Sequence, residues 1–115
     1  MSCNEGVMTR ARLGYTESLN DVVTALCSDY KRREESIAIR CAGGRTLVEY
    51  KYYTYKILEA ALEVVGERYA RDMIREIGDG VGYANSKIMC MSETTYKKLK
   101  LDVKIGVARK LHLLD

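Results

Sequence analysis

Apolar side chains recur at intervals of three and four residues along most of the chain, which is the spacing of an α-helix with one buried face. The first such stripe predicts a helix that begins after Thr16 or Ser18 and continues toward Cys41. Ser and Thr side chains cap helix N-termini by accepting a hydrogen bond from a free backbone N–H. The apolar residues of this stripe are Leu19, Val22, Val23, Leu26 and Tyr30.

A second stripe predicts a helix over residues 46–65, after a pair of glycines at residues 43–44. Its first four residues, Thr46 to Glu49, match a capping box, in which a Thr and a Glu three residues later bind the free N–H groups of the first turn. Gly66 follows, and glycine readily takes the left-handed conformation that ends many helices. The apolar residues of this stripe are Leu47, Tyr50, Ile57, Leu58, Ala61, Leu62 and Val65.

The C-terminal part of the chain predicts two further helices with a short one between them. Residues 67–77 form the first, and the glycines at positions 78, 80 and 82 end it. A short helix follows over residues 83–89. Ser92 then caps a final helix over residues 93–113.

These elements fit one small domain. A chain of 115 residues with 47% hydrophobic and 30% charged residues is typical of a globular protein. We expect an all-α fold, a single helical domain over residues 1–115 with four or five helices. The N-terminal helices occupy residues 1–66 and a C-terminal helix-turn-helix part occupies residues 67–115.

The final helix carries two apolar stripes on roughly opposite sides. The main stripe consists of Tyr96, Leu99, Val103, Val107, Leu111 and Leu114. The second consists of Leu101, Ile105 and Ala108. A helix that covers a small core needs only one stripe, so the second requires a further cover, either an N-terminal helix or the same helix of a second subunit. We therefore expect a homodimer or partner face at the second stripe.

Positive charge is concentrated at the C-terminal end of the chain. The net charge is +3, but residues 83–115 hold seven Lys or Arg against three Asp or Glu, whereas residues 1–44 are neutral and residues 45–82 carry −1. Such an asymmetry suits a polyanionic partner, although solvated lysine faces are also common.

Other classes of protein are disfavoured. No run of about 18 apolar residues predicts a membrane span, and the N-terminus lacks the pattern of a secretory signal, so we expect a cytoplasmic protein. The four cysteines are scattered and His112 is the sole histidine, so we expect reduced thiols and no metal site. Residues 78–82 fail the dinucleotide-binding pattern because Tyr83 replaces its third glycine. We expect no cofactor and no catalytic residues.

Residues 67–113 follow the order of a helix-turn-helix, with a capped basic helix at the end. In that motif the second helix enters the major groove, where its first turns contact base edges and nearby cations contact phosphates. Glu93 could accept a hydrogen bond from a cytosine, but favouring the helix N-terminus is its more common role. The residues expected to contact double-stranded DNA are Lys87, Ser92, Thr94, Thr95, Lys97, Lys98, Lys100 and Lys104.

Three segments carry a family resemblance: Glu67-Arg68-Tyr69, Ser92-Glu93-Thr94-Thr95-Tyr96 and Ala108-Arg109-Lys110-Leu111. Together they resemble the promoter-reading helix-turn-helix of bacterial sigma factors. The Ser-Glu-x-Thr-Tyr motif, a lysine and a terminal Ile-x-x-Ala-x-x-Leu-x-Leu are similar to phage-encoded transcription regulators of the ArpU and RinA kind. The residues of that terminal motif are Ile105, Ala108, Leu111 and Leu113.

The resemblance covers residues 67–115. It implies activation of late phage genes in a bacterial host by binding promoter DNA, with RNA polymerase as a further contact. It is weakest at residues 82–87, where sigma-like proteins have a clearer amphipathic helix.

A protein-interaction module is the alternative. A phage inhibitor or adaptor of a host protein could keep the helix-turn-helix as a scaffold without reading DNA. The tyrosines at positions 50, 52, 53 and 55 and the second stripe of the last helix favour this interpretation, because such rings more often pack against a core or a partner than stack on bases. The two hypotheses differ in whether the edge at Thr94, Thr95 and Lys98 is exposed enough to enter a groove.

Overall fold

The computed structural model describes residues 14–39, 45–88 and 90–114, without the side chains of residues 38, 39 and 45–50. Its helices are α2 (Glu17–Ile39), α3 (Arg45–Val65), α4 (Ala70–Asp79), the 3₁₀ helix η1 (Tyr83–Asn85) and α5 (Glu93–Lys110). The described part of the chain contains no strand. The predicted all-α class, with four α-helices in the described ranges, is confirmed.

The N-terminal helices begin and end close to the predicted residues. The Leu19 backbone N–H donates a hydrogen bond of 3.1 Å to Thr16 Oγ1, so Thr16 caps α2. Helix α3 begins at Arg45, and the side chains of the predicted capping box lie outside the described residues. Gly66 follows α3 with a φ of 80°, a left-handed conformation that suits glycine.

The glycine-rich segment ends α4 as predicted, two residues later than expected. Gly80 has a φ of 69°, and its N–H donates to the carbonyl oxygen of Ile77 at 3.3 Å. The N–H of Val81 donates to the carbonyl oxygen of Glu76 at 2.9 Å. These two bonds satisfy carbonyls that the last turn of a helix otherwise leaves free.

The predicted helix over residues 83–89 is wrong. A three-residue 3₁₀ turn, η1, stands in its place, and Ser86 after it is extended, with φ −71° and ψ 145°. Side chains satisfy the backbone here: the Ile88 N–H donates to Ser86 Oγ, and the Lys87 N–H donates to Glu76 Oε2, both at 2.9 Å. Such local bonds compete with helix formation. The described residues between α4 and α5, 80–88 and 90–92, therefore form a loop with one 3₁₀ turn.

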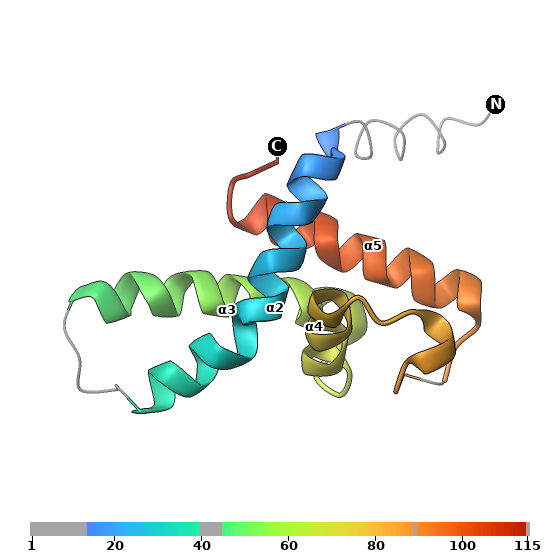
Figure 1. Cartoon of the computed structure of the whole chain (residues 1–115), viewed down its shortest axis with the longest axis horizontal. Helices are drawn as coiled ribbons and strands as arrows, with labels where there is room; N and C mark the ends of the chain where they lie inside the picture. The colour runs from blue at the N-terminus through green and yellow to red at the C-terminus, as the bar shows by residue number, and fades with distance from the viewer. Residues whose placement is uncertain (1–13, 40–44, 89, 115) are drawn as a thin grey trace.

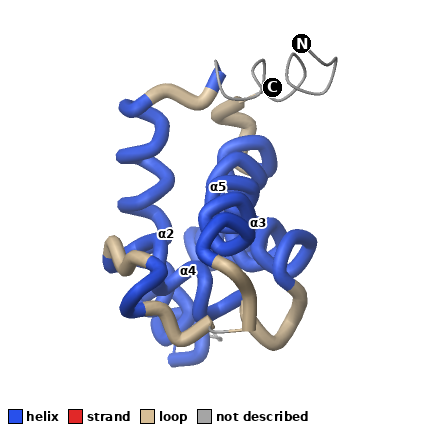
Figure 2. The backbone as a smooth tube through the Cα atoms, turned by 90° about the vertical axis from the view of Figure 1, so that its right-hand side faces the viewer, coloured by secondary structure: helices blue, strands red, loops and turns tan. Residues whose placement is uncertain are grey.

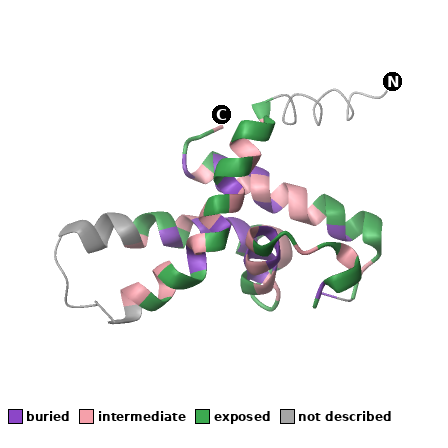
Figure 3. Ribbon diagram, in the orientation of Figure 1, coloured by how far each residue is buried: buried purple, intermediate pink, exposed green. Residues whose placement is uncertain are grey.

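The four α-helices meet in one crossing. Figure 1 shows α2 passing across α3 and α5 near the middle of the molecule, with α4 packed against both α2 and α3. Seen nearly along its axis in Figure 2, α5 lies between α2 and α3. Figure 3 shows buried positions concentrated at this crossing, and the largest fully buried side chains extend from it to the start of α5 and the loop before it. They are Tyr96, Ile57, Met73, Ile74, Ile77, Ile88, Glu76, Val23, Val103 and Val107.

One helix contact is close enough to need glycine, and a second is close without requiring it. A Cβ added to Gly78 of α4 would lie 2.5 Å from the backbone nitrogen of Ser28 in α2. A Cβ added to Gly106 of α5 would lie 3.4 Å from the Cβ of Ala60 in α3, which is a close but ordinary van der Waals distance. The first approach is backbone against backbone, so α2 and α4 can pack at this distance only without a side chain at position 78.

The second apolar stripe of α5 is covered within the chain. Ala108 is fully buried and Ile105 is 8% exposed, while Leu101 is half-buried. Helix α3 packs along this part of α5, so of the two covers predicted the N-terminal helix is the one found. The expectation of a partner face at Ile105 and Ala108 is therefore wrong, because their side chains are already inside the domain. The homodimer itself stays a prediction, but the second stripe of α5 no longer provides a surface for it.

Candidate nucleic-acid interface

The start of α5 is an exposed polar end, here called the α5 tip (residues 92–98). Ser92 caps it: the Thr95 backbone N–H donates to Ser92 Oγ at 3.2 Å. Thr94, Lys97 and Lys98 are exposed together with Ser92 and Thr95. Figure 3 shows this exposed stretch at the right-hand end of α5, away from the buried crossing. The edge predicted to meet DNA is thus accessible.

Tyr96 is the inward-facing residue of the α5 tip. It is 1% exposed, and its hydroxyl donates a 2.7 Å hydrogen bond to Glu76 Oε1. Burial, and then the hydrogen bond to the Glu76 carboxylate, raise the pKa of Tyr96 to about 12. The first turns of α5 therefore have one side fixed to the body of the domain and the other side free.

Two of the predicted DNA-contacting lysines lie elsewhere. Lys100 is half-buried, and its Nζ donates to the carbonyl oxygen of Val81 at 2.5 Å. Lys104 is also half-buried, and burial lowers the pKa of both amines. Both side chains belong to the packed side of α5, so we leave Lys100 and Lys104 out of the candidate contacts.

The remaining predicted lysines are exposed. Lys97 Nζ lies 3.9 Å from Glu93 Oε1, a loose pair one turn apart on a solvated surface. Lys98 and Lys87 are exposed as well. In contrast, Lys110 at the other end of α5 is held by carboxylates of α3, with Nζ–Oε distances of 2.8 and 2.7 Å. The positive charge of the C-terminal segment is therefore divided between an outward tip and internal contacts.

A residue that the sequence analysis missed organises this site. Glu76 of α4 is fully buried, and its Oε1 accepts a 2.6 Å hydrogen bond from Ser86 Oγ in addition to the bond from Tyr96. Its Oε2 accepts the Lys87 N–H. Burial acts to raise the pKa of Glu76, but these hydrogen bonds and nearby Arg75 outweigh it and hold the pKa below its ordinary value. The sequence did contain one signal of this burial. Position 76 is three residues from Met73, so helical spacing places Glu76 on the apolar face of α4.

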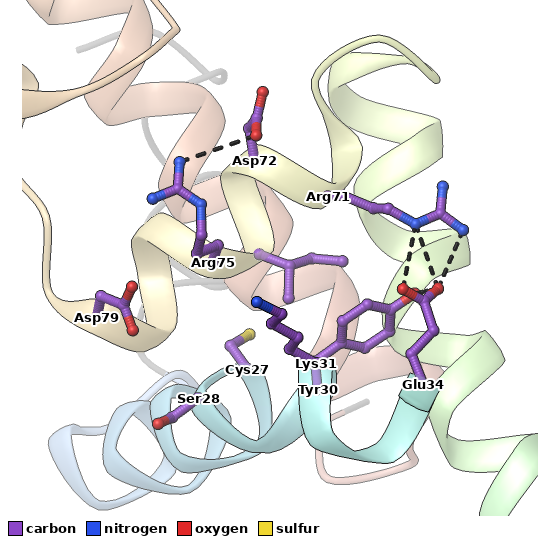
Figure 4. Close-up of a pocket in the computed structure, with 10 residues that line it drawn as sticks. Cys27, Ser28, Tyr30, Lys31, Glu34, Arg71, Asp72, Arg75 and Asp79 are labelled. Atoms are coloured by element: carbon purple, nitrogen blue, oxygen red, sulfur yellow. Dashed lines mark hydrogen bonds and ion pairs between the residues drawn. The ribbon is translucent and has the colours of Figure 1, made fainter. Parts of the chain in front are cut away.

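A pocket of about 420 Å³ lies between α2 and α4, away from the α5 tip (Figure 4). Its charged lining residues are balanced: Lys31, Arg71 and Arg75 against Glu34, Asp72 and Asp79. Two of these pairs are in contact, with Arg71 Nη2 3.0 Å from Glu34 Oε2 and Arg75 Nη2 3.8 Å from Asp72 Oδ1. The pocket therefore has no strong preference for an anion or a cation.

The thiol that lines this pocket is a poor nucleophile. Cys27 is 2% exposed, and burial raises its pKa to about 12. Because the thiolate is the reactive form, this environment keeps Cys27 protonated at neutral pH. His112 lies beyond the end of α5 and is not among the lining residues. The pocket thus does not assemble a nucleophile with a base.

Among the residues that the structure describes, no group of three or more His, Cys, Asp or Glu side chains is placed to hold a metal ion. No helix in the described ranges has the length and apolar character needed to cross a membrane. Comparisons with protein-family models, curated proteins and solved structures found no match to this chain.

Proposed function

We propose that this protein binds double-stranded DNA through the α5 tip and acts as a transcription regulator. The observation that carries the proposal is the arrangement of the tip, in which Tyr96 is fixed inward while Thr94, Thr95 and Lys98 face solvent. Short polar side chains on the first turns of a helix suit base edges, and neighbouring lysines suit phosphates. The candidate contacts are Lys87, Ser92, Thr94, Thr95, Lys97 and Lys98.

The electrostatics of the tip support the same function. The free N–H groups of a helix N-terminus carry partial positive charge, which favours a phosphate oxygen. Lys97 and Lys98 add two exposed cations, while Glu93 removes part of that charge. We expect affinity that depends strongly on salt, because each phosphate contact releases a counterion.

The more specific proposal is a phage or prophage regulator of the ArpU and RinA kind, acting on late-gene promoters and contacting RNA polymerase. It is supported by the motif at residues 92–96 and the terminal apolar pattern. The loop over residues 80–92 departs from a helix-turn-helix, because η1 replaces its first helix. Any docking on DNA therefore depends on α4 and this loop to brace α5.

Binding-site selection from random duplex DNA at near-physiological salt is the first test. Enrichment of a shared sequence supports base reading by the α5 tip. Retention of DNA without enrichment supports phosphate contacts alone. Recovery of no duplex above the background of a bead-only selection contradicts the proposed function.

Two double variants, each lacking two positive charges, test whether the DNA contacts lie at the α5 tip. Replacing Lys97 and Lys98 with alanine should weaken binding about tenfold and reduce the slope of log affinity against log salt by about two, since two phosphate contacts are lost. The matched control removes equal charge at Lys31 of α2 and Arg109 near the C-terminal end of α5, both exposed. Equal losses in the two double variants would contradict the assignment to the tip.

A protein-interaction module is the second candidate, favoured by an exposed tyrosine group on α3. Tyr52 and Tyr53 are each 47% exposed and Tyr55 is 60% exposed. Such rings suit a protein partner, because they combine a large apolar area with a polar hydroxyl. The apolar stripe of α5 no longer supports this candidate. It would replace the first proposal if the selection recovers no DNA.

A further inference from the structure

The buried carboxylate of Glu76 joins three segments at one point. Its Oε1 accepts hydrogen bonds from Ser86 Oγ at 2.6 Å and from Tyr96 Oη at 2.7 Å. Its Oε2 accepts the Lys87 backbone N–H at 2.9 Å. The carboxylate belongs to α4, Ser86 and Lys87 to the loop, and Tyr96 to the first turns of α5. One side chain therefore fixes the loop and the α5 tip to the body of the domain.

Further contacts near Glu76 close the same loop on itself and hold it against α5. The Tyr83 hydroxyl donates to the carbonyl oxygen of Met91 at 2.9 Å, and the Tyr83 and Tyr96 rings lie 5.6 Å apart. Lys100 reaches back from α5 to the carbonyl oxygen of Val81. The loop is thus tied near its beginning, middle and end.

Placing a carboxylate at a fully buried position is energetically unfavourable. Removing it from water costs several kcal/mol in general, and only full hydrogen bonding offsets that cost. Core packing alone is served as well by an apolar side chain of similar volume. What an apolar side chain cannot do is accept hydrogen bonds from the loop and from α5 at once. The network therefore fixes geometry in a way that packing does not.

We infer that Glu76 is a positioning residue that sets how the α5 tip is presented to a ligand. Its link through Tyr96 orients the tip, and its links through Ser86 and Lys87 hold the loop that flanks it. The consequence for DNA rests on the proposed function above. The claim that Glu76 fixes the loop and the tip together does not rest on it, so the two can fail separately.

Two tyrosine variants of matched chemistry test this role. Tyr96→Phe removes the hydrogen bond to Glu76, together with a longer 3.4 Å contact to the Val81 carbonyl oxygen, and keeps the ring. Tyr30→Phe removes a tyrosine–carboxylate hydrogen bond of similar length that does not involve Glu76: the Tyr30 hydroxyl donates to Glu34 Oε2 at 2.8 Å, and this bond is partly buried. Each variant is measured for thermal stability, for amide exchange by NMR at Lys87 and Ile88, and for affinity to the selected duplex.

We expect Tyr96→Phe to speed amide exchange at Lys87 and Ile88 about tenfold and to lower DNA affinity about fivefold in the folded protein. Tyr30→Phe should leave both readouts unchanged, with a smaller loss of stability, because its bond to the half-exposed Glu34 carboxylate is only partly buried. Ser86→Ala serves as a second variant and should speed exchange at Lys87 as Tyr96→Phe does. It is read at Lys87 alone, because Ser86 Oγ itself accepts the Ile88 N–H and its removal frees that amide directly.

Unchanged exchange at Lys87 in both Tyr96→Phe and Ser86→Ala would overturn the inference, as would equal effects of Tyr96→Phe and Tyr30→Phe on that exchange. If the wild-type chain binds no duplex, the proposed function fails, and the exchange comparison still decides whether Glu76 positions the tip. Retained exchange differences with unchanged DNA affinity would overturn the link between Glu76 and ligand presentation.

Discussion

The two halves of α5 share one helix face and use it in opposite ways. Thr94, Lys98, Leu101, Ile105 and Ala108 are spaced by three or four residues, so they lie along a single side of the helix. Exposure falls along that side from the exposed Thr94 and Lys98, through the half-buried Leu101, to Ala108 at 0%. The change from polar to apolar residues marks the point at which α5 comes under the cover of α3.

This contrast separates two roles in one helix. The C-terminal half of α5 stabilises the folded domain, because its side chains fill the space between α2 and α3. The α5 tip buries little apolar area beyond Tyr96, and a single hydrogen bond, from Tyr96, joins it to Glu76. Substitutions in the two halves should therefore change different measured quantities.

The largest expected difference comes from truncating one side chain in each half. Ile105→Ala should lower the free energy of unfolding by about 3 kcal/mol, because it leaves a cavity beneath α3. Lys98→Ala, two turns earlier on the same face, should change it by less than about 0.5 kcal/mol. Urea unfolding at neutral pH measures both. Similar losses in the two variants would break the comparison.

A smaller effect is expected from adding a methyl group in the body of the domain. Gly78→Ala places a Cβ 2.5 Å from the Ser28 nitrogen, so α2 and α4 must separate, at a cost of about 2 kcal/mol. Gly82→Ala is the matched control, because its added Cβ meets nothing within 4 Å and its φ is −90°. Thermal unfolding measures the melting temperature of the two variants. A destabilised Gly82→Ala together with an unchanged Gly78→Ala would contradict the close approach of α2 and α4 at position 78.

The smallest effect is expected from pH and concerns the attachment of the tip. The pKa of Glu76 is held below its ordinary value, so the stability it contributes is present above about pH 4.5 and is lost as the pH falls through the lowered pKa. Arg75, Tyr96 and Lys100 are the titratable groups facing it. Glu76→Gln should flatten the fall in unfolding free energy between about pH 5 and pH 3.

Asp29 and Glu34 also have lowered pKa values, in part because arginines bind them, so the wild-type curve includes their contribution as well. The diagnostic quantity is therefore the difference between wild type and Glu76→Gln across the acid range. Parallel curves for the two proteins would show that Glu76 does not contribute to acid sensitivity.

The fold class and most helix ends could be predicted because they depend on local signals. Thr16 and Ser92 cap their helices, and Gly66 and Gly80 end theirs through left-handed backbone. The helix expected over residues 83–89 was wrong because side chains bind two of its backbone N–H groups: Ser86 Oγ accepts that of Ile88, and Glu76, a residue from another element, accepts that of Lys87. Spacing along the chain carries no information about such a partner.

The exposed residues of the candidate site could be predicted from the sequence, whereas the burial of two of its lysines could not. The outward residues of the α5 tip followed from the Ser92 cap and the helical period. Lys100 and Lys104 could not be separated from Lys97 and Lys98 by charge alone, because only packing turns the first pair toward the body. The second apolar stripe was recognised correctly, but periodicity does not say which element covers it.

The buried thiol of Cys27 can report when α2 and α4 separate. Its sulfur lies in α2 near the closest approach of α4, and Cys90 by contrast is exposed. A thiol-alkylating reagent should meet Cys90 directly, whereas Cys27 becomes reactive only when the two helices separate and its pKa returns to normal. In a chain whose other cysteines are replaced by serine, the labelling rate would therefore follow the loosening of the α2–α4 contact itself.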